Sequence, residues 1–388
     1  MKPSVGNYKF NSVLFLGLLL ICLPSKAQET NTKAFHPGEL WLDQNGEHIN
    51  AHGGGFLYHN NTYYWFGEFK TTGEEGNKAM VGVQVYTSKD LYHWKNEGVA
   101  LKVHNDTNSK LVKGCVIERP KVIYNPKTKK FVMWFHHELK GEKYKAALTG
   151  VAVADQATGP YEYLKSFRIQ AGVLPKNMSK EAFDAIPTLD ENIKLNKQVR
   201  IEQAMRGEIF KRDFEGGQMS RDMTLFVDDD GTAYHVTASE ENQTLLISKL
   251  SDDFLSLSKE YIRVFPGGRN EAPAIFKNNG QYFMFSSGLT GWKPNPGKLS
   301  VAKKMMGEWT ALENPCRGTE DEMNTTFWSQ STYVIPVANK KNAFIFTADR
   351  WVPDNHKDGR YIWLPVQFDN GIPYLEWKKS WDLSIFSK

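Results

Sequence analysis

The chain has 388 residues, 48 basic and 44 acidic side chains, and a formal net charge of +4. The first 27 residues contain Lys2, Lys9 and Lys26 and no acid, so these residues carry most of the net positive charge. This distribution argues against a nucleic-acid-binding protein. The cysteines and histidines show no spacing typical of a zinc site.

Residues 1–27 are typical of a secretory signal peptide. Their apolar core runs from Val13 to Leu23 and is too short to span a bilayer as a permanent helix. We therefore expect a secreted or periplasmic protein without a stable membrane span. Cys22 leaves a lipid-anchored form as an alternative, although Ile21 before it is larger than the small residue preferred at a lipid attachment site.

Residues 28–388 are expected to form one catalytic domain rich in β-structure, because 13% of the chain is aromatic and short alternating apolar runs are frequent. Five segments share one pattern: a polar or charged leading residue, a short apolar run, a turn, and a second run led by an aromatic residue. The leading residues are His52, Glu118, Asp222, Glu271 and Gln330. The same interval separates His52 from Tyr63 and Glu271 from Tyr282.

Each repeated segment is followed by a closing stretch with an aromatic residue or a leucine before a polar turn. These stretches begin at Leu91, Gly159, Asp253, Gly307 and Tyr374. Five four-stranded units that each cover the apolar face of a neighbour predict an all-β protein, a five-bladed β-propeller. A β-sandwich is the alternative, but it would not repeat one leading position five times.

Two segments need a separate interpretation. Residues 165–219, between the second and third units, have mixed charge and weak helical spacing. We expect an inserted excursion with short helices near the rim of a pocket, and a solvated loop is the alternative. The stretch 228–231 (Asp-Asp-Asp-Gly) looks like a metal loop but occupies the turn position of its repeat, so we interpret it as a turn.

The five leading residues should converge on one pocket, because the first strand of every propeller blade lies along the central axis. Carboxylates gathered there repel one another, and this repulsion costs free energy. Packing alone therefore does not explain the cluster, and a function does. Cleavage of a glycosidic bond uses such a cluster, since one carboxylic acid must be kept protonated. Glu271 is the candidate acid, and Asp222 is the neighbouring charge that raises its pKa.

Five stretches resemble strand-start motifs of glycoside hydrolase family 43, and they are most similar to those of its exo-β-1,3-galactanase branch. They read IERPKVIYN, SRDMTLFVDDDGTAY, NEAPAIF, TGWKPN and WSQSTYV. The similarity extends from about His36 to the C-terminus. It implies an inverting hydrolase on a five-bladed propeller, with Glu271 as the acid and Asp222 as the modulator of its pKa.

The start of the first unit departs from the wider family, in which the resemblance would imply an aspartate base. This chain has His52 there. The galactanase branch is similar in lacking that aspartate, and the resemblance implies that Gln330 holds the attacking water as its imidic tautomer, with Glu118 nearby. A plain amide is a poor base, so Glu118 and His52 are alternatives for water activation.

Substrate contacts are expected at the mouth of the pocket, where aromatic rings stack on a sugar and polar groups bind its hydroxyls. The candidates are His52, Glu68, Tyr144, Asn242, Thr290, Trp292 and Trp328. For each aromatic residue, packing between blades is the alternative.

The leading hypothesis is a secreted inverting exo-β-1,3-galactanase acting on the β-1,3-galactan backbone of arabinogalactan-type glycans. An α-L-arabinofuranosidase or β-xylosidase of the same family is the second, and the missing first-unit aspartate argues against it. A catalytically silent glycan-binding propeller is the third. We expect an oligo- or polysaccharide substrate, no cofactor or metal, no nucleic-acid partner, and a monomer.

Overall fold

The computed structural model describes Met1 and residues 33–72, 76–78, 80–106, 108–190, 194 and 196–387. Residues 2–27 of the proposed signal peptide, with the apolar core from Val13 to Leu23 and with Cys22, lie outside the described residues. The chain divides into Met1–Lys33 and Ala34–Lys388, and the described helices and strands all belong to the second unit.

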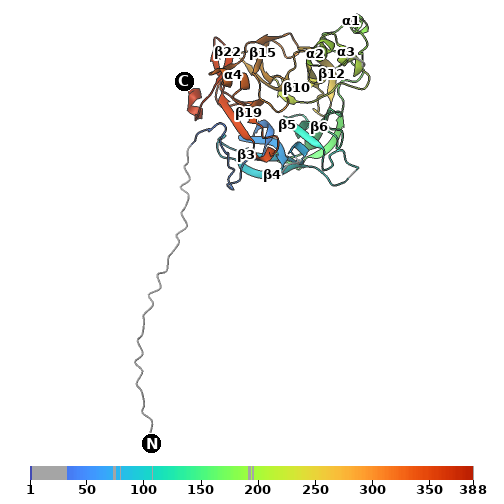
Figure 1. The fold of residues 1–388 in the computed structure, drawn as a ribbon. Coiled ribbons are helices and arrows are strands. Elements are labelled where there is room, and N and C mark those ends of the chain that lie inside the picture. The colour runs from blue at the N-terminus through green and yellow to red at the C-terminus, as the bar shows by residue number, and fades with distance from the viewer. Residues whose placement is uncertain are drawn as a thin grey trace. The chain divides into compact units, whose positions relative to one another are not determined.

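Four sheets contain four consecutive antiparallel strands each (Figure 1). The first sheet has β1 (His52–His59), β2 (Thr62–Lys70), β3 (Met80–Ser88) and β4 (Lys95–Lys102), and the second has β5 (Val116–Asn125), β6 (Lys130–Glu138), β7 (Leu148–Ala154) and β8 (Glu162–Phe167). The third has β9 (Met223–Val227), β10 (Ala233–Ser239), β11 (Thr244–Leu250) and β12 (Leu257–Val264), and the fourth has β13 (Glu271–Asn278), β14 (Gln281–Ser287), β15 (Lys298–Ala302) and β16 (Trp309–Leu312).

The remaining strands form two sheets of three. One has β18 (Gln330–Pro336), β19 (Phe344–Arg350) and β20 (Arg360–Pro365), and the other has β17 (Cys316–Arg317), β22 (Ile372–Glu376) and β21 (Gln367–Asp369). The all-β propeller class is confirmed, but the prediction of five four-stranded sheets is wrong, because the described residues form six sheets.

The local chain conformation explains why the last predicted unit divides. Pro365 ends β20 and has no N–H with which to continue a ladder. Asn370 and Gly371, with φ of 49° and 82°, then turn the chain into the hairpin β21–β22. β22 pairs in parallel with β17, from the segment after the fourth sheet, instead of joining β20.

Apolar clusters between successive sheets form the core and close a ring. Each cluster joins a buried side chain of one sheet to one of the next, and the sheet β18–β20 packs on the first sheet. Representative pairs in chain order are Phe66 with Phe135, Trp134 with Leu225, Ile247 with Met284, Phe285 with Phe346, and Trp363 with Trp65. Ring closure brings the first strands of these sheets together around one axis.

Short helices lie outside the sheets. The α-helices are α1 (Lys180–Asp184), α2 (Lys197–Met205), α3 (Glu208–Arg212) and α4 (Glu320–Thr325), and the 3-10 helices are η1 (Gly76–Lys78), η2 (His356–Asp358) and η3 (Leu383–Ser387). Side chains of Ser179 and Asn196 cap α1 and α2. Helices α1 to α3 lie beside β12 (Figure 1), and Phe210 packs against Leu246 and Tyr261 there.

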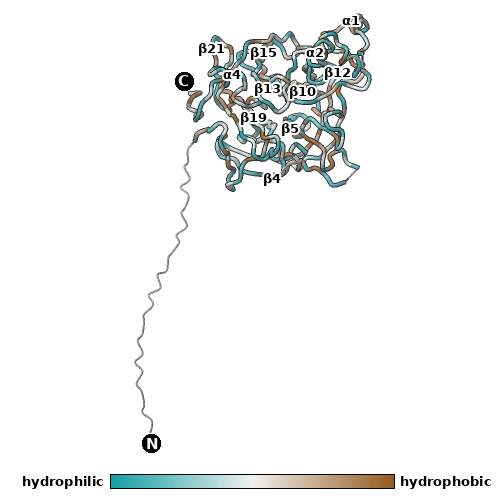
Figure 2. Tube along the Cα trace, in the orientation of Figure 1, coloured by the Kyte–Doolittle hydropathy of each residue, from teal (hydrophilic) through white to brown (hydrophobic). Residues whose placement is uncertain are grey.

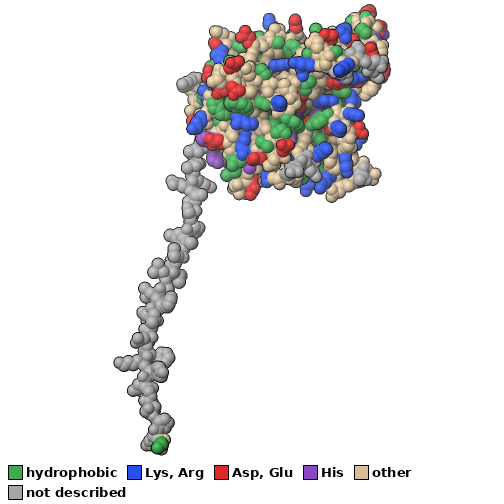
Figure 3. Space-filling model, viewed as in Figure 1, with side chains coloured by type: hydrophobic (Ala, Val, Ile, Leu, Met, Phe, Trp, Pro, Cys, Tyr) green, Lys and Arg blue, Asp and Glu red, His purple; other side chains and the backbone are tan. Residues whose placement is uncertain are grey.

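The surface is mixed in character. Apolar and polar residues alternate over short stretches of the chain (Figure 2), and basic and acidic side chains are interspersed on the face drawn in Figure 3. None of the described helices combines the length and the apolar character needed to cross a bilayer.

Candidate active site

Irregular strand starts direct the leading residues inward. His52, Glu271 and Gln330 each begin a first strand, Glu118 lies near the start of β5, and Asp222 directly precedes β9. The strand register shifts just after His52, Glu118, Glu271 and Gln330, as at a β-bulge. A bulge bends its strand and changes the direction of the side chains beside it.

The pocket formed at these strand starts has a volume of about 220 Å³. Eight predicted site residues line it: Glu68, Glu118, Tyr144, Asp222, Asn242, Glu271, Trp292 and Gln330. Six further residues line it that the sequence analysis did not single out: Arg119, His136, Arg221, Leu289, Gly291 and Trp351.

Three predicted residues do not line this pocket. His52 is 0% exposed, stacks on Tyr361, and has no hydrogen-bond partner on either ring nitrogen among the described residues. Thr290 is exposed, and its hydroxyl donates to the carbonyl of Lys293 at 2.6 Å. Trp328 lines an adjacent hollow that it shares with Trp292 and Trp351.

Glu271 has the surroundings of a protonated acid. Its side chain is almost fully buried, and Asn242 Nδ2 donates to its Oε1 at 2.6 Å. Burial and the nearby charge of Asp222 raise the pKa of Glu271 to about 8. The carboxyl group can therefore keep its proton at neutral pH. Asn242 Oδ1 is buried and has no hydrogen-bond partner among the described residues.

The Arg119 guanidinium connects several sides of the pocket. Its Nη2 lies 3.2 Å from Asp222 Oδ2 and also donates to Gln330 Oε1, and its Nη1 donates to the carbonyl of Ser331 at 2.8 Å. Burial opposes the charge of Arg119, but Asp222 and the other nearby carboxylates raise its pKa. One cation therefore compensates several carboxylates at the pocket floor.

Gln330 is held by contacts on both ends of its amide. Its Oε1 accepts from Arg119 and, at 3.2 Å, from Trp351 Nε1, while its Nε2 donates to Ser287 Oγ at 2.9 Å. These contacts orient the amide. They use only one of the two N–H groups on Nε2.

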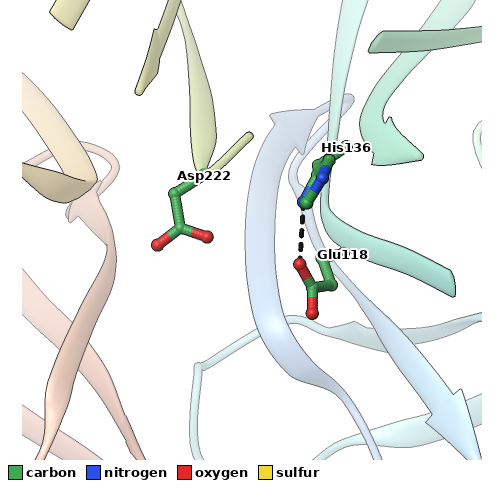
Figure 4. A group of neighbouring side chains, drawn as sticks. All are labelled: Glu118, His136 and Asp222. Carbon is green, nitrogen blue, oxygen red and sulfur yellow. Dashed lines mark ion pairs between the residues drawn. The ribbon is translucent and has the colours of Figure 1, made fainter. Parts of the chain in front are cut away.

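Glu118 belongs to a buried row of charges that continues away from the pocket. Its Oε2 lies 2.7 Å from His136 Nδ1 (Figure 4). His136 Nε2 in turn lies 2.8 Å from Glu138 Oε1. Tyr144 donates to Glu118 Oε1 at 2.7 Å. Burial alone would lower the pKa of His136, but bonding to the two carboxylates raises it to about 9. The bond and charge of His136 outweigh burial and hold the pKa of Glu118 well below its usual range.

Glu118, His136 and Asp222 have the spacing of a possible metal site, since one ligand atom of each lies within 4.8 Å of the others. Despite burial, bonding to Glu118 and Glu138 raises the pKa of His136 to about 9, so a cation at this position would have to displace a proton from the imidazole. Arg119 already pairs with Asp222. These residues therefore suit a charge network better than a divalent cation.

Cross-strand pairing explains one of the residues that sequence analysis missed, His136. Glu118 lies directly opposite His136, and Gln330 lies opposite Asp349. His52 is likewise opposite Glu68. The signal available in the sequence was a polar residue in the second strand of a repeat, opposite the leading residue. This signal can be used only when the pairing register of the two strands is known.

A family model and solved structures both relate this chain to one family of glycoside hydrolases. The family described as glycosyl hydrolases family 43 matches residues 206–373. The chain is similar to the solved structure of a family 43 β-1,3-galactosidase with galactodeoxynojirimycin, with 48% identity and a TM-score of 0.81 over 90% of this chain and 100% of that chain.

Two fungal proteins are also similar. One is the exo-β-1,3-galactanase of Phanerochaete chrysosporium solved with β-1,3-galactotriose, with 31% identity and a TM-score of 0.72 over 91% of this chain and 68% of that chain. The other is a curated β-D-galactofuranosidase of Aspergillus niger, 26% identical over 157 residues. That match spans 40% of this chain and 44% of the Aspergillus protein, less than half of either.

The buried row Glu118, His136 and Glu138 generates a prediction about charge. Glu138→Gln removes one of two carboxylates from His136, so the pKa of His136 should fall from about 9 toward 6.5. Because the folded pKa lies above 6.5, the stabilisation is fully present below pH 6.5 and is lost as pH rises through about 9. The free energy of unfolding should therefore fall by about 3 kcal/mol near pH 6 and by less at high pH.

Nuclear magnetic resonance titration of the imidazole and denaturant unfolding at several pH values would measure both effects. Glu142→Gln, on the exposed loop after β6, is the matched control and should leave the His136 titration unchanged. An unshifted His136 titration in Glu138→Gln would contradict the assignment.

Proposed function

Since the chain belongs to glycoside hydrolase family 43, we propose that it is an inverting exo-β-1,3-galactanase that removes galactose from β-1,3-galactan. The observation that carries this proposal is a buried Glu271 with a raised pKa, in one pocket with Gln330 and the ionised Glu118. The choice of substrate rests on the β-1,3-galactosidase and exo-β-1,3-galactanase to which the chain is similar.

Glu271 acts as the general acid in this proposal. Its proton passes to the glycosidic oxygen as the bond from that oxygen to the anomeric carbon breaks, and the carboxylate remains. Asp222 maintains the raised pKa by charge repulsion, because it is the nearby carboxylate that most opposes ionisation of Glu271. The hydrogen bond from Arg119 holds Asp222 in place. The Arg119 side-chain hydrogen bonds described above do not include Glu271.

Gln330 and Glu118 are proposed to act on the water. Glu118 is ionised at neutral pH, and its contacts with His136 and Tyr144 make it a weak base at rest. In this proposal those contacts loosen as Glu118 accepts the proton and the water oxygen bonds to the anomeric carbon from the opposite face. Gln330 orients that water. The imidic tautomer suggested by the resemblance would place a hydroxyl on Oε1 against the two donors Arg119 and Trp351, so the contacts favour the ordinary amide.

We also propose that the protein is exported and acts as a single domain. The composition of residues 1–27 supports a cleaved signal peptide and a secreted or periplasmic location. Residues 28–388 are proposed to act as one catalytic domain, as a monomer, on an oligo- or polysaccharide.

The substrate assignment predicts the product. The purified protein should release galactose from β-1,3-galactan, and little arabinose or xylose from the corresponding aryl glycosides, as measured by chromatography. Galactose should appear first as the α-anomer, since inversion of a β-link gives that product. Preferred release of arabinose or xylose would favour the second hypothesis, and no release from any substrate would favour a silent glycan-binding propeller.

The acid assignment predicts a dependence on the leaving group. Glu271→Gln should lower kcat/KM on galactan by about 10²–10⁴-fold, the usual contribution of a general acid. The loss should be much smaller for an aryl galactoside whose leaving group departs without a proton. Equal losses on both substrates would assign Glu271 to binding rather than proton transfer.

The water-activating side predicts a pattern across three variants. Glu118→Gln and Gln330→Ala should both lose about 10²-fold or more in kcat. Gln330→Glu should retain more activity than Gln330→Ala, because a carboxylate can take a proton from water directly. Steady-state kinetics on galactan would measure this order, and a mild effect of Gln330→Ala beside a severe effect of Glu118→Gln would leave Glu118 alone as the base.

A further inference from the structure

The turn between β10 and β11 has an unusual backbone. Glu240, Glu241 and Asn242 are consecutive non-glycine residues with φ of 51°, 58° and 62°. Such left-handed residues are uncommon singly and cost free energy, so they persist where surrounding contacts determine the conformation. The contacts that determine this turn come from the inserted segment 165–219 and from β12.

Glu240 anchors the first position of the turn. It is 0% exposed, and Arg263 on β12 donates to both of its oxygens, from Nε at 2.7 Å and from Nη2 at 2.8 Å. Arg263 Nη2 also donates to the carbonyl of Ala204 on α2 at 3.2 Å, and its guanidinium lies 5.0 Å from the ring centre of Phe210 on α3. A bidentate pair of this kind fixes orientation as well as charge.

Glu241 is bound directly by the inserted helices. Arg200 Nε of α2 lies 2.9 Å from Glu241 Oε2, and Arg212 Nη1 of α3 donates to Glu241 Oε1 at 2.7 Å. Two neighbouring carboxylates in the turn are thus held by three arginines, and the two helices contribute to both attachments.

Asn242, the third residue of the turn, reaches the opposite side and contacts the acid. Its Nδ2 donates to Glu271 Oε1 at 2.6 Å. We propose that helices α2 and α3, together with Arg263 of β12, position the catalytic acid, because by holding Glu240 and Glu241 they fix Asn242 Nδ2 against Oε1 of Glu271. The inference rests on the proposed function of Glu271, and it makes Arg200, Arg212 and Arg263 positioning residues.

The contact assigns the proton to one oxygen. The carbonyl oxygen of a carboxylic acid is a stronger acceptor for an N–H than its hydroxyl oxygen, so the donor favours the carbonyl oxygen. With Asn242 on Oε1, the transferable proton of Glu271 lies on Oε2. If the turn relaxes, either oxygen can carry the proton and the acid loses its defined orientation toward the leaving group.

Glu241→Gln and the double variant Arg200→Gln/Arg212→Gln test the clamp without altering the pocket lining. Both should lower kcat on β-1,3-galactan by about 10- to 10²-fold, as misplacement of a catalytic group does, with little change in KM. The loss should be smaller on an aryl galactoside with a good leaving group. A thermal unfolding midpoint for each variant separates loss of fold from loss of position.

The pH–rate profile provides a readout that a purely structural role would not move. Losing the Asn242 donor disfavours the Glu271 anion, so the alkaline limb should move upward by on the order of one pH unit. The other charges that act on Glu271, from Asp222, Arg119, Arg221, Glu118 and Lys298, are unchanged in these variants. Asn242→Ala should shift the limb in the same direction, and Asp222→Asn in the opposite direction.

Arg206→Gln is the matched control. Arg206 directly follows α2 and pairs with Glu202 and Glu208 rather than with the turn, so its variant should keep the wild-type profile. An unmoved alkaline limb in both clamp variants, with an active wild-type protein, would overturn this inference alone. A wild-type protein that releases no galactose would instead refute the proposed function, and this inference with it.

Discussion

Charge compensation by Arg119 is the interaction on which the pocket depends. Carboxylates brought together at the axis of a closed ring would repel and lose hydration, and one partner that pairs with Asp222 and binds Gln330 offsets part of that cost. The same cation leaves Glu271 outside its direct contacts. Asp222 therefore opposes ionisation of the neighbouring Glu271 carboxyl group and raises its pKa, as an acid catalyst needs.

Backbone amides extend this compensation from one sheet to the next. At three strand starts the residue after the leading position has a positive φ, and its N–H donates to an acid of the preceding sheet around the ring. The bonds are from Gly53 to Asp349 at 2.6 Å, from Arg119 to Glu68 at 3.1 Å, and from Ala272 to Asp222 at 3.0 Å. Each of the three irregular strand starts thus provides a donor for a neighbouring carboxylate, and those of Glu118 and Glu271 also direct a side chain into the pocket.

The sequence predicted the leading residues because polarity at a strand start is a local pattern that a repeat makes visible. It did not predict His136 or Trp351, since their proximity to Glu118 and Gln330 depends on strand register and on the closure of the ring. Arg119 was missed although it follows Glu118, because regular alternation would turn it away from the pocket and only the bulge turns it inward. The six-sheet arrangement was missed because the parallel partner of β22 is far from it in sequence.

Closure of the ring also bears on how the protein can be divided. The pocket lining runs from Glu68 in the first sheet to Trp351 after β19, so each sheet that packs into the ring contributes to it. A fragment with fewer of these sheets could keep an apolar cluster between adjacent pairs, yet it would lack part of the charge network. Such contacts between distant segments form late and slowly in folding. Catalytic competence is therefore a property of the completed ring, and recovery of activity reports the final closure step rather than the formation of individual sheets.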